Sequence, residues 1–107
     1  MKTIYGATDD DYLIYREGSG DTIEIFDIVV NSKRRCGIGK SMIRKLMASI
    51  PRGTKLVWAI TRSENFIAQQ FYESERFRII AVLREFYKDG DHPPTIDAIM
   101  YGRDIAQ

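Results

Sequence analysis

The pattern of hydrophobic and polar positions along the 107 residues predicts six strands and two helices. Runs rich in β-branched and aromatic residues indicate strands at 2–7, 11–17, 22–30, 55–60, 78–87 and 95–102. Apolar residues at helical spacing indicate helices at 38–50 and 64–74, the second with Ser63 as its N-cap. The resulting order, βββαβαββ, is typical of a mixed α/β (α+β) fold.

The third predicted strand carries apolar side chains at both parities. Ile23 and Ile25 share one parity, whereas Phe26 and Ile28 share the other. Burial of both faces is typical of a central strand that has a helix on each side. We therefore expect a mixed, mostly antiparallel central sheet with helices on both faces.

Composition narrows the class of protein. Sixteen basic and fifteen acidic residues leave a net charge of +1, which argues against a polycation that binds nucleic acid or membranes. The single cysteine, Cys36, forms no internal disulfide and fits a reducing compartment. No apolar stretch approaches the roughly 20 residues of a membrane span. We expect one cytoplasmic domain, residues 1–107, although Lys33, Arg34 and Arg35 leave a local nucleic-acid contact as an alternative.

A glycine-containing run separates the third strand from the first helix. It reads Arg34-Arg35-Cys36-Gly37-Ile38-Gly39-Lys40. Glycine allows the backbone to approach an anion closely. The free N–H groups and the dipole of a helix start favour negative charge there. The run therefore predicts a site for a phosphorylated cofactor.

Three kinds of phosphate-binding motif compete for this run. A nucleotide-binding P-loop ending at Gly39-Lys40-Ser41 would need a glycine where Arg34 stands. A dinucleotide fingerprint would need a glycine at Met42. The remaining pattern, Arg34-x-x-Gly37-x-Gly39, resembles the acyl-CoA-binding signature of the GNAT superfamily of N-acetyltransferases.

A second motif strengthens the resemblance. Asn65-x-x-Ala68-x-x-Phe71-Tyr72-x-x-x-x-Phe77 is similar to the later segment of the same family, in the right order and after the next strand. Arg76 stands where the family usually has a glycine. Family members also usually begin with a strand and two helices that contribute to the acceptor site, so this chain resembles a minimal version that starts at the family's second strand.

The resemblance implies acetyl-CoA as the acyl donor and no metal. It places the pantetheine arm along the backbone of the third strand and the pyrophosphate over the amides of the glycine run, with Arg34, Arg35 and Lys40 as further charge contacts. Asn65 would bind the pantetheine or cap the turn. The implied cofactor-binding residues are Ile28, Val29, Val30, Arg34, Arg35, Cys36, Gly37, Ile38, Gly39, Lys40, Asn65 and Tyr72.

The resemblance also implies catalytic roles. Tyr72 corresponds to the tyrosine that protonates the departing thiolate in many members, although core packing is its alternative role. Apart from the resemblance, Glu24 and Asp27, on opposite faces of the third strand by parity, are candidates for a base that acts directly or through water, with Glu24 favoured. Their alternative role is a salt bridge or a hydrogen-bonded edge position. His92 lies in a loop with Gly and Pro, where exposure is expected.

The leading hypothesis is an acetyl-CoA-dependent N-acetyltransferase in which a primary amine attacks directly in a ternary complex. The amine could belong to a small molecule, a peptide N-terminus or a lysine. The alternative is a non-catalytic acyl-CoA-binding regulatory or interaction module. A homodimer is expected to cover surface that the absent helices would otherwise occupy.

Overall fold

The computed structural model describes residues 1–31, 37–88 and 95–105 and confirms the order of elements expected from the sequence. The six strands and two helices make a mixed α+β fold. The elements are β1 (Lys2–Tyr5), β2 (Tyr12–Glu17), β3 (Thr22–Val29), α1 (Ile38–Ser49), β4 (Leu56–Arg62), α2 (Phe66–Ser74), β5 (Arg78–Tyr87) and β6 (Ile96–Asp104).

The chain divides into two compact units. The first comprises Met1–Val57 with Asp104–Gln107, and the second comprises Trp58–Arg103. Helix α1 belongs to the first unit and α2 to the second, so the placement of helices on both faces of one sheet stays a prediction. The single-domain organisation of residues 1–107 also stays a prediction.

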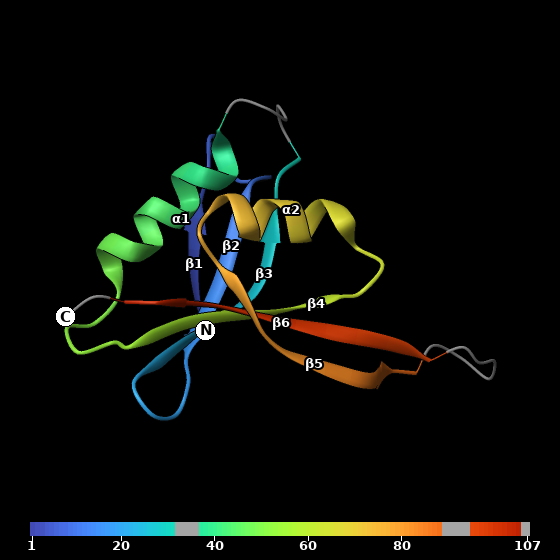
Figure 1. Ribbon diagram of the computed structural model, residues 1–107. Helices are drawn as coiled ribbons and strands as arrows, with labels where there is room; N and C mark the ends of the chain where they lie inside the picture. Colours follow the sequence, from blue (N-terminus) through green and yellow to red (C-terminus); the bar gives the residue numbers. More distant parts are fainter. Residues whose placement is uncertain (32–36, 89–94, 106–107) are drawn as a thin grey trace. The chain divides into compact units, whose positions relative to one another are not determined.

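The first unit contains an antiparallel meander of β1, β2 and β3 (Figure 1). One face of β2 and β3 is apolar and buried, and α1 contributes an apolar stripe at helical spacing. Burial of these side chains is the main favourable term in folding this unit. The buried apolar residues that β2, β3 and α1 contribute are Leu13, Tyr15, Ile23, Ile25, Ile38, Met42, Ile43 and Leu46.

A β-bulge interrupts β3 where the sequence pattern predicts a regular strand. Tyr15 pairs with Ile25 and Ile14 with Asp27, so Phe26 is an extra residue without a partner on β2. Phe26 is 56% exposed, so the prediction that both faces of the strand are buried is wrong at this position. Bulges are frequent beside active sites, because they redirect the side chains that follow.

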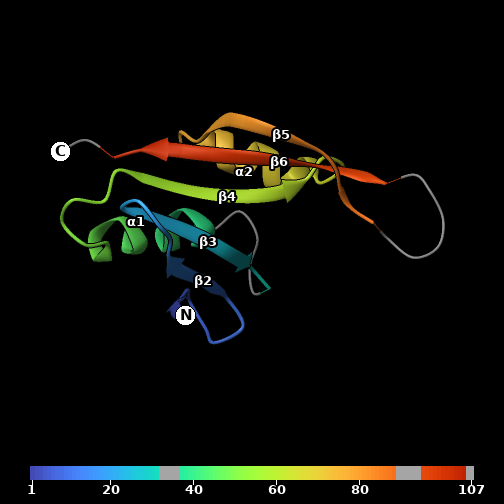
Figure 2. The same ribbon diagram turned by 90° about the horizontal axis from the view of Figure 1, so that it is seen from below.

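The second unit contains β6 between β4 and β5, with β5 and β6 antiparallel (Figure 2). Helix α2 packs on this unit through aromatic rings. The Tyr72 ring stacks on Tyr101 of β6 at a centroid distance of 5.7 Å and meets the edges of Phe71 and Phe77 at 5.5 and 5.2 Å. Such pairs add about 0.5–1.5 kcal/mol beyond the burial of their area.

The helix α2 begins later than predicted. Ser63 was expected to cap a helix from Glu64, but Asn65 is the N-cap and its Oδ1 accepts a hydrogen bond from Ala68 N at 3.1 Å. The Ser63 N–H donates to Asp97 O of β6 at 2.9 Å, so Ser63 pairs with β6 directly after the end of β4. The expected Ser63 cap is therefore wrong, because pairing with β6 continues through that residue.

Arg76 adopts the left-handed conformation that explains the glycine usual at this position. Its φ is 68°, and Phe77 N donates to Tyr72 O at 2.9 Å across the helix end. A left-handed backbone costs a residue with a Cβ about 1–2 kcal/mol. Replacement by glycine removes this cost, but the greater unfolded-state entropy of glycine offsets part of the gain.

We predict that Arg76→Gly raises the free energy of unfolding by about 0.5–1 kcal/mol. Urea or thermal unfolding measures the change. Arg76→Ala is the matched control, because it removes the same side chain but keeps the Cβ. Equal stabilisation by both variants would show that the long side chain, not the backbone conformation, is unfavourable.

Candidate active site

The start of α1 supplies the described part of the predicted phosphate-binding run. Gly37 is the N-cap with φ 70° in the left-handed region, and it offers no side-chain oxygen to the amides of the first turn. The first turn contains no acidic residue, and Lys40 is exposed within it. This helix start therefore suits an anion electrostatically.

The other members of the run differ in how they are placed. Ile38 is buried and anchors the helix start in the core, whereas Gly39 is half-buried. Arg34, Arg35 and Cys36 lie outside the described residues, so their predicted contacts with the pyrophosphate stay predictions.

The carboxyl end of β3 carries the predicted pantetheine-binding backbone. Ile28 pairs with Leu13 and Val29 with Tyr12, and Val30 follows directly after the strand. All three residues of this end, 28–30, are half-buried. Their binding role stays a prediction.

Glu24 and Asp27, predicted to lie on opposite faces of β3, share one face. Glu24 pairs with Arg16 and Asp27 with Ile14, two residues of the same parity on β2. The bulge at Phe26 is the physical reason. One extra residue in a strand moves each side chain after it to the face opposite to the one that regular alternation predicts. The apolar side chains change parity after Ile25, which fits a bulge but fits a strand buried on both faces equally well.

The two carboxylates differ in their surroundings. Glu24 Oε1 accepts a hydrogen bond from Arg16 Nε at 2.7 Å, and its side chain is only 14% exposed. The Arg16 guanidinium also lies 5.7 Å from the ring centroid of Phe26. Asp27 is exposed to solvent. Glu24 is thus held as an ion-paired carboxylate, whereas Asp27 is open to water.

Tyr72 lies in the second unit and is 4% exposed. Its aromatic neighbours fix the orientation of its ring. Burial, and secondarily the Glu73 carboxylate, raises the pKa of the stacked Tyr101 above its ordinary value of 10.0. The catalytic and the packing roles of Tyr72 both stay predictions, because core packing alone would give the same geometry.

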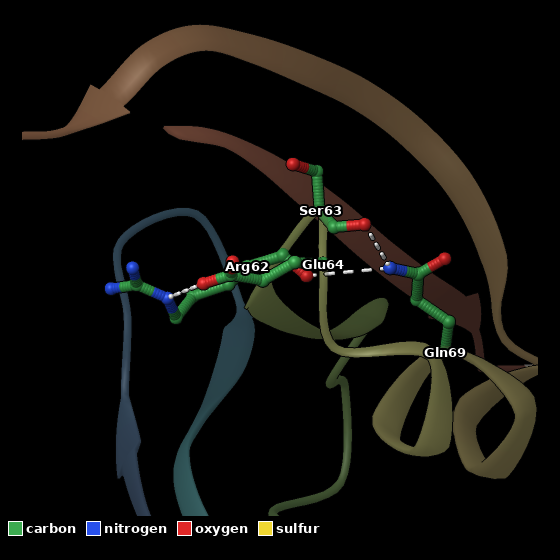
Figure 3. A network of polar contacts seen from close by, with 4 residues as sticks. All are labelled: Arg62, Ser63, Glu64 and Gln69. Carbon is green, nitrogen blue, oxygen red and sulfur yellow. Dashed lines mark hydrogen bonds and ion pairs between the residues drawn. The ribbon is translucent and has the colours of Figure 1, made fainter. Parts of the chain in front are cut away.

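Asn65 takes the capping role of its two predicted roles, and a polar network surrounds it. Gln69 Nε2 donates to Ser63 O at 2.9 Å and to Arg62 O at 3.3 Å, and Arg62 pairs with Glu64 at 2.8 Å (Figure 3). These bonds fix the connection from β4 to α2. The predicted contact of Asn65 with the pantetheine stays a prediction.

Thr61 on β4 has an unusual environment. The residue is 7% exposed, and within the described part of the chain its Oγ1 is a buried side-chain oxygen without a hydrogen-bond partner. Burying an unsatisfied hydroxyl costs about 1–3 kcal/mol.

Thr61→Val is therefore expected to stabilise the fold by about 1 kcal/mol in urea unfolding. Thr54→Val is the matched control, because the buried Thr54 hydroxyl donates to Pro51 O at 2.7 Å. We expect that control to lose about 0.5–1.5 kcal/mol. A destabilised Thr61→Val variant would mean that the hydroxyl has a partner in solution.

Among residues 1–31, 37–88 and 95–105, no group of three or more His, Cys, Asp or Glu side chains is arranged to hold a metal ion. Neither of the helices described is long and apolar enough to cross a membrane.

The α+β fold and a helix start that suits an anion fit the family expected from the two sequence motifs, and comparison with known families agrees. Residues 4–76 match the Acetyltransferase (GNAT) family. The chain therefore belongs to the GNAT acetyltransferase family. No curated protein matches it significantly.

Solved structures share the fold. The ribosomal-protein-S18-alanine N-acetyltransferase from Escherichia coli is 26% identical with a TM-score of 0.74, covering 92% of this chain and 63% of its own. An acetyltransferase from Bacillus anthracis in complex with acetyl coenzyme A is 23% identical with a TM-score of 0.81, covering 91% and 57%. Chaetomium thermophilum Naa20 with a bisubstrate analogue is 21% identical with a TM-score of 0.78, covering 90% and 60%. The chain thus spans about three fifths of the length of these structures.

Proposed function

We propose that this protein is an acetyl-CoA-dependent N-acetyltransferase that transfers an acetyl group to a primary amine. The observation that carries the proposal is the start of α1. Gly37 has a left-handed backbone there, and the first turn of the helix contains no acidic residue. This helix follows a strand with a β-bulge in a chain of the GNAT family. The E. coli protein that shares this fold is a ribosomal-protein-S18-alanine N-acetyltransferase. That activity supports an amine as the acetyl acceptor here.

The reaction needs an attacking amine, a group that stabilises the oxyanion and groups that hold the cofactor. The neutral amine nitrogen attacks the thioester carbonyl, a C–N bond forms, the C–S bond breaks, and coenzyme A leaves as a thiolate. A backbone N–H at Ile28–Val30 would stabilise the oxyanion. The amides and Lys40 at the start of α1 would hold the pyrophosphate.

Proton movements complete the reaction. A lysine ammonium, with a pKa near ~10.4, must lose one proton to a base before attack, the nitrogen must lose a second proton as the amide forms, and the thiolate must gain one. We assign the thiolate protonation to Tyr72. For the amine, Asp27 is open to water, whereas Glu24 would first have to release Arg16. Asp27 or water bound to it is therefore the better base candidate of the two.

Binding and transfer are tested separately. Calorimetry of the purified chain with acetyl-CoA tests the cofactor, and absence of binding would overturn the proposal. A screen of small amines, peptide N-termini and lysine peptides, followed by thiol release, then tests transfer. The chain's one cysteine limits the background to one thiol per chain. Tight binding without transfer to any amine would instead support the non-catalytic acyl-CoA-binding module.

The homodimer also remains a proposal, and exposed apolar side chains support it. Ile79, Val82 and Phe86 of β5 are 51–57% exposed, and β5 is the last strand in the sheet order. Their contact with a second copy would remove apolar area from water. A monomer mass by analytical ultracentrifugation at micromolar concentration would contradict it.

A further inference from the structure

Asp11 is a fully buried carboxylate for which the proposed chemistry has no use. It lies in the turn between β1 and β2 and is 0% exposed. Its Oδ1 accepts a hydrogen bond from the backbone N–H of Asn31 at 2.9 Å. Bonds from a main-chain N–H to a carboxylate are stronger than neutral ones, and removing one partner leaves a buried group unsatisfied. The end of β3 is therefore held by a side chain from another strand connection.

A second bond joins the same two segments. The Asn31 side chain donates from Nδ2 to Asp10 O at 3.1 Å. The turn is itself rigid, because Gly6 N donates to Asp11 O at 2.8 Å and Asp11 N donates to Thr8 O at 3.1 Å. Asn31, two residues beyond the end of β3, is thus attached twice to a closed turn.

The same turn contacts the start of α1. A Cβ at Gly6 would lie 2.7 Å from Asp11 Cβ and 2.7 Å from Ile38 Cγ2, which is closer than real Cβ contacts allow. Ile38 is the first residue of α1, directly after the Gly37 N-cap. Further along α1, Lys45 Nζ donates to Tyr5 O at the end of β1 at 3.0 Å. The missing side chain at Gly6 lets the helix start approach the turn.

We propose that Asp11 and Gly6 are positioning residues that hold the end of β3 and the first turn of α1 in the geometry needed to bind the cofactor pyrophosphate. The inference rests on the proposed function. It adds a residue from the β1–β2 turn, which neither motif contains. Asp11 acts through Asn31 and Gly6 acts through Ile38, and neither residue is expected to touch the cofactor.

The test measures two affinities by calorimetry, one for acetyl-CoA and one for S-acetylpantetheine, which lacks the pyrophosphate. Asp11→Ala should weaken acetyl-CoA binding by about tenfold and S-acetylpantetheine binding clearly less, because the end of β3 that Asn31 follows also carries the proposed pantetheine-binding backbone. Asp11→Asn should restore most of the loss, because its amide oxygen still accepts from Asn31 N. Asp9→Ala is the matched charge control, since Asp9 is an exposed residue of the same turn.

A separate variant tests whether a loss of folding stability alone changes the two affinities. Leu46→Val shortens a fully buried side chain later in α1 and should lower the melting temperature without changing either affinity. If Asp11→Ala fails to fold, Gly6→Ala takes its place, because it keeps the carboxylate but displaces Ile38 or Asp11. It should give the same selective loss for acetyl-CoA.

The outcomes separate the two proposals. If the wild type does not bind acetyl-CoA, the proposed function fails and this inference fails with it. Wild-type binding with unchanged affinity in Asp11→Ala, or in Gly6→Ala where that variant replaces it, would overturn the inference alone. Equal losses for both donors would also overturn it, because they would indicate a general loss of structure.

Discussion

Replacement of Tyr72 by phenylalanine is expected to lower kcat by about 10²-fold, with acetyl-CoA affinity nearly unchanged. Phenylalanine keeps the ring that packs against Phe71, Phe77 and Tyr101, so the core of the second unit should persist. Only the phenolic proton donor is lost. Steady-state kinetics with the best amine acceptor, together with calorimetry, measure the two quantities.

Tyr101→Phe is the control for this experiment. It removes another buried phenol, in direct stacking contact with the first, and keeps the ring. We expect it to retain kcat within a few-fold. Unchanged turnover in Tyr72→Phe would assign that residue to packing alone. Equal losses in both variants would indicate that the aromatic cluster, not one hydroxyl, sustains activity.

The order of elements could be predicted from the sequence because strand and helix periods differ strongly. The bulge at Phe26 could not be predicted as a bulge, because apolar residues on both parities also fit a strand buried on both faces. Pairing with β2 decides between these, and pairing is a long-range property. The consequence is functional, since it places Glu24 and Asp27 on one face.

Residues of the candidate site could be predicted from the sequence only where they belong to a motif. Gly37 and Tyr72 stand in recognisable spacings, whereas Asp11 has no local signature. An aspartate before a strand usually indicates a turn. Its burial and its bond to Asn31, twenty residues later, depend on the closure of the meander. Supporting residues of this kind require a structure.

Substitution of Gly37 is expected to have the second large effect. The left-handed backbone of this residue, and not contact with neighbouring atoms, disfavours other residues there. Its φ is 70°, while an added Cβ would meet no atom of residues 1–31, 37–88 and 95–105 within 4 Å. A substitution there is therefore a test of backbone strain without steric clash. Left-handed backbone costs residues with a Cβ about 1–2 kcal/mol, and β-branched residues are the least tolerant, whereas asparagine tolerates it best.

We expect Gly37→Val to lose about 1–2 kcal/mol, divided between folding stability and acetyl-CoA binding. If the helix start keeps its conformation, the cost appears in urea unfolding. If it relaxes to another conformation in the free protein, the cost appears as an affinity up to about tenfold weaker, since the cofactor must restore the left-handed geometry. Gly37→Asn should lose much less of both. Equal losses in the two variants would show that the bound cofactor excludes any side chain at this position, and that close contact, not strain, requires the glycine.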